Sequence, residues 1–201
     1  MALPHKQPDA KRTTEFMQLL HAFQSVERVI YAPDLVRKEN DVEHSYMLVM
    51  LCWYFLDVFK LDLDKCKILE YALVHDFIEV YAGDTFIFDT EGQKSKHERE
   101  EQARLRLADE FPEFKDMHAR IEEYEKRKDP EAVFVHEVDK FIPLVTGYIQ
   151  KGSMWKKLDM KPDELFANKR ARITVNTEIR DLLEQFIQEL ESRPSDFFNQ
   201  K

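Results

Sequence analysis

Glycine is scarce in this chain, with only four among its 201 residues. Architectures of strands and tight turns need glycine where the backbone adopts positive φ, so this scarcity argues against them. It also excludes the glycine-rich loops that cradle phosphate groups, because neither GxGxxG nor GxxxxGK[ST] occurs. If the protein handles phosphate, a metal ion and arginine side chains must do it.

Long hydrophobic runs are also missing. The longest covers residues 46–56, which is 11 residues, whereas a membrane-spanning helix needs about 20. Residues 1–14 are polar and do not resemble a secretory signal. The two cysteines, Cys52 and Cys66, lie in apolar helical surroundings typical of small core residues in a reducing compartment. We therefore expect a cytoplasmic protein that does not enter a membrane.

A broad basic surface is not expected either, because the formal net charge is -9. This disfavours nucleic acid as a partner but leaves room for a small anionic substrate where positive charge is local. The 43% hydrophobic content is typical of a globular chain, and the length fits one domain. We expect that domain over residues 13–194, between a flexible tail at 1–12 and a C-terminal tail at 195–201.

Helical periodicity and capping residues predict an all-α bundle of roughly six to nine helices. Residues 29–42 are expected to form a loop, because Pro33 disfavours helix at the residue before it. Pro143 lies inside an expected helix and should kink it. Aromatic residues within 85–92 are expected to line a pocket or to cover the core. The expected helices are 13–28, 41–59, 64–81, 94–110, 114–125, 129–152 and 169–192, with a linker and short helix at 159–167.

One stretch concentrates polar side chains inside an apolar segment. His75, Asp76, Glu79 and Asp84 place an imidazole and three carboxylates within ten residues. Burying such groups without partners costs several kcal/mol, so we interpret the stretch as a metal site. On one continuous helix over 64–81, His75 and Glu79 share a face, and Glu79 can handle a bound water. The alternative is a surface helix end that happens to carry acids.

Two further residues, His44 and Asp139, are expected to lie close to this stretch in the fold. The short link at 60–63 predicts an antiparallel helical hairpin, which brings His44 to the same end as His75. Asp139 stands on an apolar run beside Pro143, and this placement suggests that it points into a site. The alternatives are that His44 only caps or packs its helix, and that Asp139 pairs with a buried arginine or lysine.

His44, His75, Asp76 and Asp139 together suit one divalent ion, with Mn, Co, Ni, Fe, Zn and Mg as candidates. In a six-coordinate site, two positions remain for water and substrate. At this point the sequence resembles the HD-domain metal-dependent phosphohydrolases, α-helical proteins with an H…HD…D signature. The match is closer to the small, single-domain 5'-deoxyribonucleotidase branch. The matching motifs span about residues 16–190 and are Glu43-His44-Ser45, His75-Asp76-x-x-Glu79-x-x-x-Gly83-Asp84 and Val138-Asp139-Lys140.

The resemblance implies that those two histidines and two aspartates bind the metal. It implies that Glu79 orients or deprotonates the attacking water and that Asp84 lies beside the sugar and phosphate. Arg28 matches an arginine that contacts phosphate, with one extra residue before the Glu43-His44 motif, and Arg37 is a second candidate for substrate binding. Where bacterial members carry a tryptophan after that arginine, this chain has Val29, so the base and sugar preference stays open.

The expected function is therefore that of a 5'-nucleotidase, releasing phosphate from (deoxy)nucleoside 5'-monophosphates. We expect a small nucleotide substrate and a homodimer. One alternative is a nucleoside triphosphate hydrolase or phosphodiesterase on the same site. A two-metal phosphodiesterase would need additional ligands from His97, His118 and His136. A third reading is a non-enzymatic helical module stapled by its metal.

Overall fold

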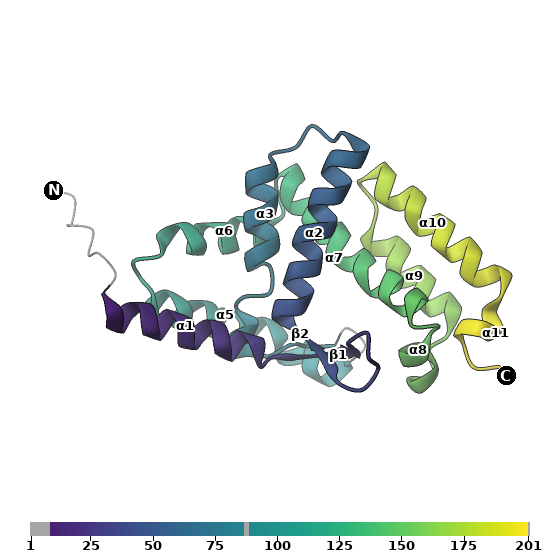
Figure 1. The fold of residues 1–201 in the computed structure, drawn as a ribbon, viewed down its shortest axis with the longest axis horizontal. Coiled ribbons are helices and arrows are strands. Elements are labelled where there is room, and N and C mark those ends of the chain that lie inside the picture. Colours follow the sequence, from purple (N-terminus) through teal and green to yellow (C-terminus); the bar gives the residue numbers. More distant parts are fainter. Residues whose placement is uncertain (1–8, 87–88, 201) are drawn as a thin grey trace.

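Helices make up most of the described part of the chain, residues 9–86 and 89–200, in this computed structural model (Figure 1). The all-α prediction is confirmed, although the eleven helices of these residues exceed the expected range. In chain order the helices are α1 (Ala10–Gln24), α2 (Asp41–Phe59), α3 (Lys65–Val74), α4 (Glu79–Ala82), α5 (Thr90–Glu110), α6 (Lys115–Lys126), α7 (Pro130–Ile149), α8 (Ser153–Lys157), α9 (Pro162–Arg172), α10 (Thr177–Ser192) and α11 (Pro194–Phe197). A hairpin of β1 (Glu27–Tyr31) and β2 (Lys38–Asn40) lies between α1 and α2.

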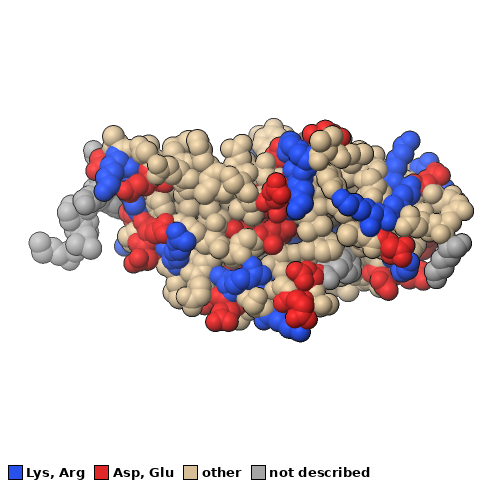
Figure 2. All heavy atoms as spheres, turned by 90° about the horizontal axis from the view of Figure 1, so that it is seen from below, with Lys and Arg blue, Asp and Glu red and all other residues tan. Residues whose placement is uncertain are grey.

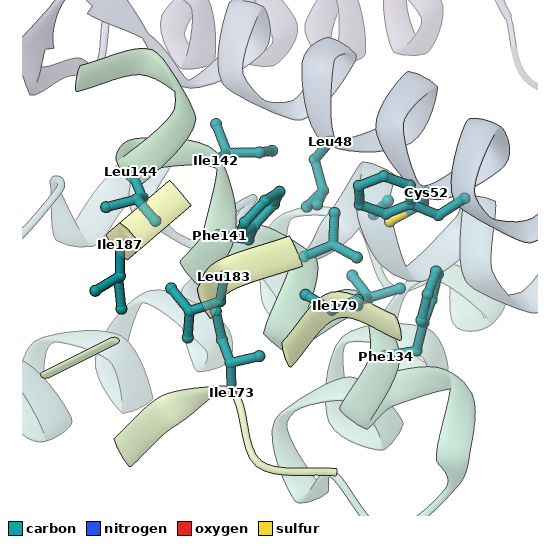
Figure 3. Close-up of a cluster of buried hydrophobic side chains, with 14 of the residues drawn as sticks. Leu48, Cys52, Phe134, Phe141, Ile142, Leu144, Ile173, Ile179, Leu183 and Ile187 are labelled. Atoms are coloured by element: carbon teal, nitrogen blue, oxygen red, sulfur yellow. The ribbon is translucent and has the colours of Figure 1, made fainter. Parts of the chain in front are cut away.

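The main core lies where α2, α3 and α7 pack together and α10 closes one side. Figure 3 shows Leu48 of α2, Phe141 of α7 and Leu183 of α10 converging in it. Cys52 is buried there, but Cys66 is exposed, which corrects its expected core position. A smaller apolar cluster joins α1 to α5 and α6, and it includes Leu19, Phe23, Phe77, Leu107 and Ile121.

Capping residues start the helices that carry the site. Asn40 and Glu43 form a reciprocal capping box at the start of α2, and this pattern satisfies two backbone donors that the first turn leaves free. Asp129 caps α7 by accepting from the backbone of Ala132, followed by Pro130 in the first turn. The predicted starts of α2 and α7 are confirmed.

The N-terminal helix and the segment after it differ from the prediction. The helix begins at Ala10, because the Asp9 side chain accepts a hydrogen bond from Arg12 N, and it ends at Gln24. Residues 1–8 of the expected tail lie outside the described residues. The expected loop at 29–42 is instead the hairpin, whose strands pair antiparallel with Tyr31 opposite Lys38. β-branched and aromatic residues favour strands, and residues 29–31 are of these types.

The C-terminal third also differs. The expected helix at 169–192 is broken, because the buried Glu137 carboxylate accepts hydrogen bonds from the backbone N–H groups of residues 174–176. The expected tail at 195–201 is partly structured, since α11 buries Phe197 and the residue after it is also buried. Gly152 is required beneath this segment, because its φ is +66° and a Cβ there would overlap the Phe197 carbonyl.

Within the described ranges, no helix combines the length and the apolar character needed to cross a bilayer. The predicted helix at 94–110 begins earlier, at Thr90, capped by Asp89. Residues 87–88 of the aromatic loop lie outside the described ranges, so its predicted role is not addressed for them.

Candidate metal centre

The backbone breaks at the predicted His75-Asp76 pair. α3 ends at Val74, and tight turns follow in which Phe77 N donates to Val74 O (3.1 Å) and Glu79 N donates to Asp76 O (2.8 Å). The single helix expected over 64–81 was therefore wrong. Its predicted stop is confirmed, because Gly83 has φ +72° and caps α4 through a hydrogen bond to Glu79 O.

This break decides which nitrogen of His75 faces the site. The Ala72 carbonyl lies 3.0 Å from His75 Nδ1. Because a carbonyl oxygen can only accept, Nδ1 carries a hydrogen, and in the neutral ring Nε2 then holds the lone pair. That Nε2 is buried and has no hydrogen-bond partner among the described residues, and it lies 2.9 Å from Asp76 Oδ2. A buried lone pair without a donor is the arrangement that a metal ion satisfies.

His44 meets this pair from α2. Its side chain is fully buried, and its ring centroid lies 5.4 Å from that of His75. On one side, His44 Nε2 lies 3.0 Å from Asp139 Oδ1 on α7. On the other side, His44 Nδ1 lies 3.6 Å from Glu39 Oε1 on β2. The structure therefore brings together all four predicted ligands, although they come from three separate elements.

The donor set fits a divalent ion. One ligand atom from each of His44, His75 and Asp76 falls within 4.8 Å of the others, and Asp139 is hydrogen-bonded to the first of these. Burial raises the pKa of Asp139, but Lys140 and His44 outweigh burial and hold the pKa well below its usual range. An ionised carboxylate beside two imidazoles is a donor set that first-row transition ions accept.

Asp41 is a site residue that the sequence reasoning missed. It is fully buried at the start of α2. Arg28 on β1 bridges it to the centre, because the same guanidinium nitrogen lies 3.0 Å from Asp41 Oδ1 and 2.8 Å from Asp76 Oδ2. Burial, opposed by Arg28, raises the pKa of Asp41 to about 6. An acid in the first turn of an apolar helix, three residues before His44, was the available signal.

Glu79 stands beside the centre as a buried acid. It is 4% exposed, and its Oε2 has no hydrogen-bond partner among the described residues. Burial, followed by the charges of Asp76, Asp41 and Asp84, raises the pKa of Glu79 to about 11. Asp41, Asp76 and Glu79 also offer ligand atoms within 4.8 Å of one another. Such crowding of carboxylates leaves negative charge for a cation to offset.

The centre opens into a groove of about 670 Å³ that runs along α7. Arg28, Glu79 and Asp84 line it, as do three of the four candidate ligands, namely His75, Asp76 and Asp139. Its volume lies within the range of small-molecule sites.

Arg37 does not reach this groove. It pairs with Glu43 at 2.6 Å and lines a separate apolar pocket between β2 and α2. His97 and His136 line the groove, whereas His118 lies 2.8 Å from the Phe111 carbonyl. Within the described part of the chain, none of these three histidines belongs to a cluster of candidate ligands.

Comparison with known proteins bears on this geometry. A family model described as HD domain matches residues 17–186. The chain belongs to the HD domain family. The bovine 5'-deoxynucleotidase HDDC2 is 31% identical over 159 residues, covering 78% of this chain and 74% of that protein. The human 5'-deoxynucleotidase HDDC2 is 30% identical over 160 residues, with the same two coverages.

Solved structures share the architecture. A structure titled as a predicted metal-dependent phosphohydrolase from Magnetospirillum magnetotacticum MS-1 superposes with a TM-score of 0.80 at 24% identity, covering 93% of this chain and 94% of that one. The PH0347 protein from Pyrococcus horikoshii OT3 gives 0.66 at 22% identity, covering 87% of this chain and 98% of that one. The chain is therefore an HD-domain protein with the fold of these solved structures, and His44, His75 and Asp76 offer donor atoms that could hold a divalent metal ion.

Proposed function

We propose that this HD-domain protein is a 5'-nucleotidase, a phosphomonoesterase that releases phosphate from (deoxy)nucleoside 5'-monophosphates. The relatives named 5'-deoxynucleotidase support this substrate class. The observation that carries the proposal is the buried Glu79, with a free carboxylate oxygen beside the cluster of candidate ligands. A metal site with a purely structural role has no need of an additional unpaired acid in its wall.

His44, His75, Asp76 and Asp139 are the residues that we propose hold the ion. Such an ion, when bound, polarises phosphoryl oxygens and lowers the pKa of a water molecule. The chain supplies the rest through positioning. The Ala72 carbonyl fixes the His75 ring, and Asp139 is held by Lys140, whose Nζ lies 2.6 Å from Asp139 Oδ2.

Glu79 is the proposed proton acceptor. Its raised pKa reflects burial among carboxylates, although Arg28 already lowers it, and the further positive charge of a bound cation would bring the carboxyl group back toward ionisation. The free Oε2 then accepts a proton from the attacking water. The water oxygen forms a new bond to phosphorus, the P–O bond to the sugar breaks, and the departing sugar oxygen gains the proton that Glu79 took from the water.

Arg28 and Asp84 are the proposed substrate contacts. Arg28 is held at the mouth of the centre by Asp41 and Asp76, so its guanidinium is already oriented before a phosphate arrives. Fork-shaped donors of this kind bind phosphate oxygens well. Asp84 lines the same groove just after α4, where it can accept a hydrogen bond from a sugar hydroxyl.

A direct assay tests the proposal. Metal-stripped protein is resupplied with Mn, Co, Ni, Zn or Mg, and phosphate release is measured from a panel of 5'-mononucleotides, for the unaltered protein and for Glu79→Ala. We expect metal-dependent release that the variant loses. Release from triphosphates or cyclic nucleotides alone would replace the proposal by one of the other phosphohydrolase activities. No phosphate release from any of these substrates would favour a non-enzymatic module in which the metal ion has a structural role.

A further inference from the structure

A group of positively charged side chains forms one wall of the groove, next to the candidate ligand Asp139. It consists of Arg127 at the end of α6, Lys140 on α7, and Lys169 and Arg172 on α9, and we call it the cationic wall. These four residues come from three elements. The proposed hydrolysis of a monophosphate assigns none of them a contact with the substrate.

The cationic wall lacks acidic partners. Across residues 9–86 and 89–200, no carboxylate lies within ion-pair distance of Arg127, Lys169 or Arg172, and Lys140 pairs with Asp139 alone. Elsewhere the two signs are mixed, as Figure 2 shows on the face that it displays. Three of the four acids that line the groove from α5 and α6 are paired within their own helices, at 3.2 Å for Glu100–Lys96, 2.7 Å for Glu101–Arg104 and 2.5 Å for Glu122–Lys126. The fourth, Glu125, has no ion pair among the described residues.

The burial of Lys169 among other positive charges is energetically unfavourable. Its side chain is only 7% exposed, and its Nζ donates a hydrogen bond to the Lys140 carbonyl (2.7 Å). Burial, followed by the charge of Lys140, lowers the pKa of Lys169 to about 7. A buried ammonium group next to like charges is unfavourable unless an anion comes to it. The chain has an excess of carboxylates, with a net charge of -9, yet the carboxylate that acts on Lys169 is Asp139, which is already paired with Lys140.

The wall is continuous with the candidate metal centre through Lys140. Its Nζ lies 2.6 Å from Asp139 Oδ2, and its backbone carbonyl receives Lys169 Nζ. An anion held by Lys169 and Arg172 would therefore be a neighbour of a phosphate held at the centre. Two guanidinium groups and two ammonium groups suit a doubly charged group with several acceptor oxygens, which describes a phosphate better than a carboxylate.

We propose that the cationic wall binds a second phosphate group of the substrate, so that nucleotides with two phosphates are preferred over 5'-monophosphates. This rests on the proposed function for the first phosphate. The second phosphate is carried either on the first, as in a nucleoside 5'-diphosphate, or on the other side of the sugar, as in a nucleoside 3',5'-bisphosphate. Both present the same chemistry to the wall.

Calorimetric titration tests the proposal. Metal-loaded protein with Glu79→Gln, which keeps the ligands intact, is titrated with adenosine 5'-monophosphate, 5'-diphosphate and 3',5'-bisphosphate. The same titrations are made after adding Arg172→Gln, at a partly exposed position, or Arg127→Gln, at an exposed one, because changes at such positions put folding at little risk. The matched control is Arg170→Gln, because Arg170 is on the same helix but is exposed and pairs with Glu184 at 2.7 Å.

We expect at least one ligand with two phosphates to bind about tenfold more tightly than the monophosphate, the effect of one charge-assisted contact. The ratio of the two affinities, about ten in the starting protein, should fall toward one in Arg172→Gln and Arg127→Gln and should persist in Arg170→Gln. Whichever ligand gains identifies where the second phosphate is carried. Equal binding of all three ligands, or a gain that survives Arg172→Gln, would overturn the assignment.

The two proposals fail separately. Turnover of monophosphates by the unaltered enzyme, with no gain from a second phosphate, would remove the role of the wall and leave the 5'-nucleotidase. An Arg172-dependent gain in an enzyme that does not hydrolyse monophosphates would keep the wall as a phosphate site and end the 5'-nucleotidase proposal.

Discussion

Glu39 and His44 face each other where β2 joins α2, with 3.6 Å between Glu39 Oε1 and His44 Nδ1. Both side chains are buried, and neither Glu39 oxygen has a hydrogen-bond partner among the described residues. A histidine that holds a metal through one nitrogen usually donates its other N–H to a carboxylate or carbonyl. Glu39 is therefore placed to orient His44 toward the centre.

Removing that carboxylate should weaken metal binding. We predict that Glu39→Gln lowers the affinity for the ion about 10- to 100-fold, the usual effect of losing such a partner. Titration of metal-stripped protein in competition with a chelator measures it. Glu27→Gln is the control, since Glu27 is an exposed acid on the paired strand. Equal affinities in the two variants would contradict this role for Glu39.

Arg28 and Arg37 should differ sharply. Arg28→Ala removes the cation that bridges Asp41 and Asp76, and we predict a fall in turnover of about 100-fold or more. Arg37→Ala should change kcat/KM by less than about twofold, because Arg37 lies outside the groove, paired with Glu43. Metal content by mass spectrometry separates lost catalysis from lost metal. A large effect at Arg37 would restore it as a substrate contact.

The metal-free protein should lose stability as pH rises, partly through Glu79. Its pKa is about 11 in the folded chain against an ordinary 4.5. Between these pH values the unfolded chain has released the proton and the folded chain still holds it, so the free energy of unfolding falls as pH rises. Glu79→Gln removes that loss. We predict a Tm about 3 °C or more above the unaltered protein at pH 8, and no difference near pH 4. Calorimetric scans between pH 4 and pH 8 measure the two Tm values. A difference in Tm that stays constant with pH would point to a packing effect of the substitution instead.

The outward face of α2 should mediate a homodimer. Tyr46, Met50 and Trp53 are 66%, 45% and 46% exposed, and no Asp, Glu, Lys or Arg occurs on α2 between Glu43 and Asp57. A charge-free apolar face can pair with its own copy without repulsion.

Met50→Glu would place two like charges across that interface, and we predict a monomer in light scattering after size exclusion. Leu105→Glu is the control, because Leu105 is a 49% exposed apolar residue on α5, a helix with no substantial contact to α2. A monomeric unaltered protein would contradict the prediction directly.

The helices and the four candidate ligands could be predicted from the sequence, because the patterns that indicate them are local or follow from simple helix geometry. Asn40 and Asp129 cap by their own side-chain chemistry, and a short hairpin between two helices leaves His44 and His75 few places to lie except together. These features depend on a few neighbouring residues.

Other features depend on what packs where. The helix break at His75 was hidden because apolar periodicity continues through Phe77 and Val80. The buried carboxylates of Glu39 and Asp41 were missed because residue type gives no measure of burial, and acids are mostly exposed. The cationic wall joins residues from three elements, so it exists only once the helices have docked.

His75 and His44 differ in how easily a substitution elsewhere can disturb the orientation of their rings. The acceptor for the His75 N–H is a backbone carbonyl, which every residue type provides at position 72. The acceptor facing His44 Nδ1 is one side chain, Glu39. Divergence among related sequences can therefore disturb the orientation of His44 through a single substitution, whereas that of His75 changes only if the path of the backbone changes.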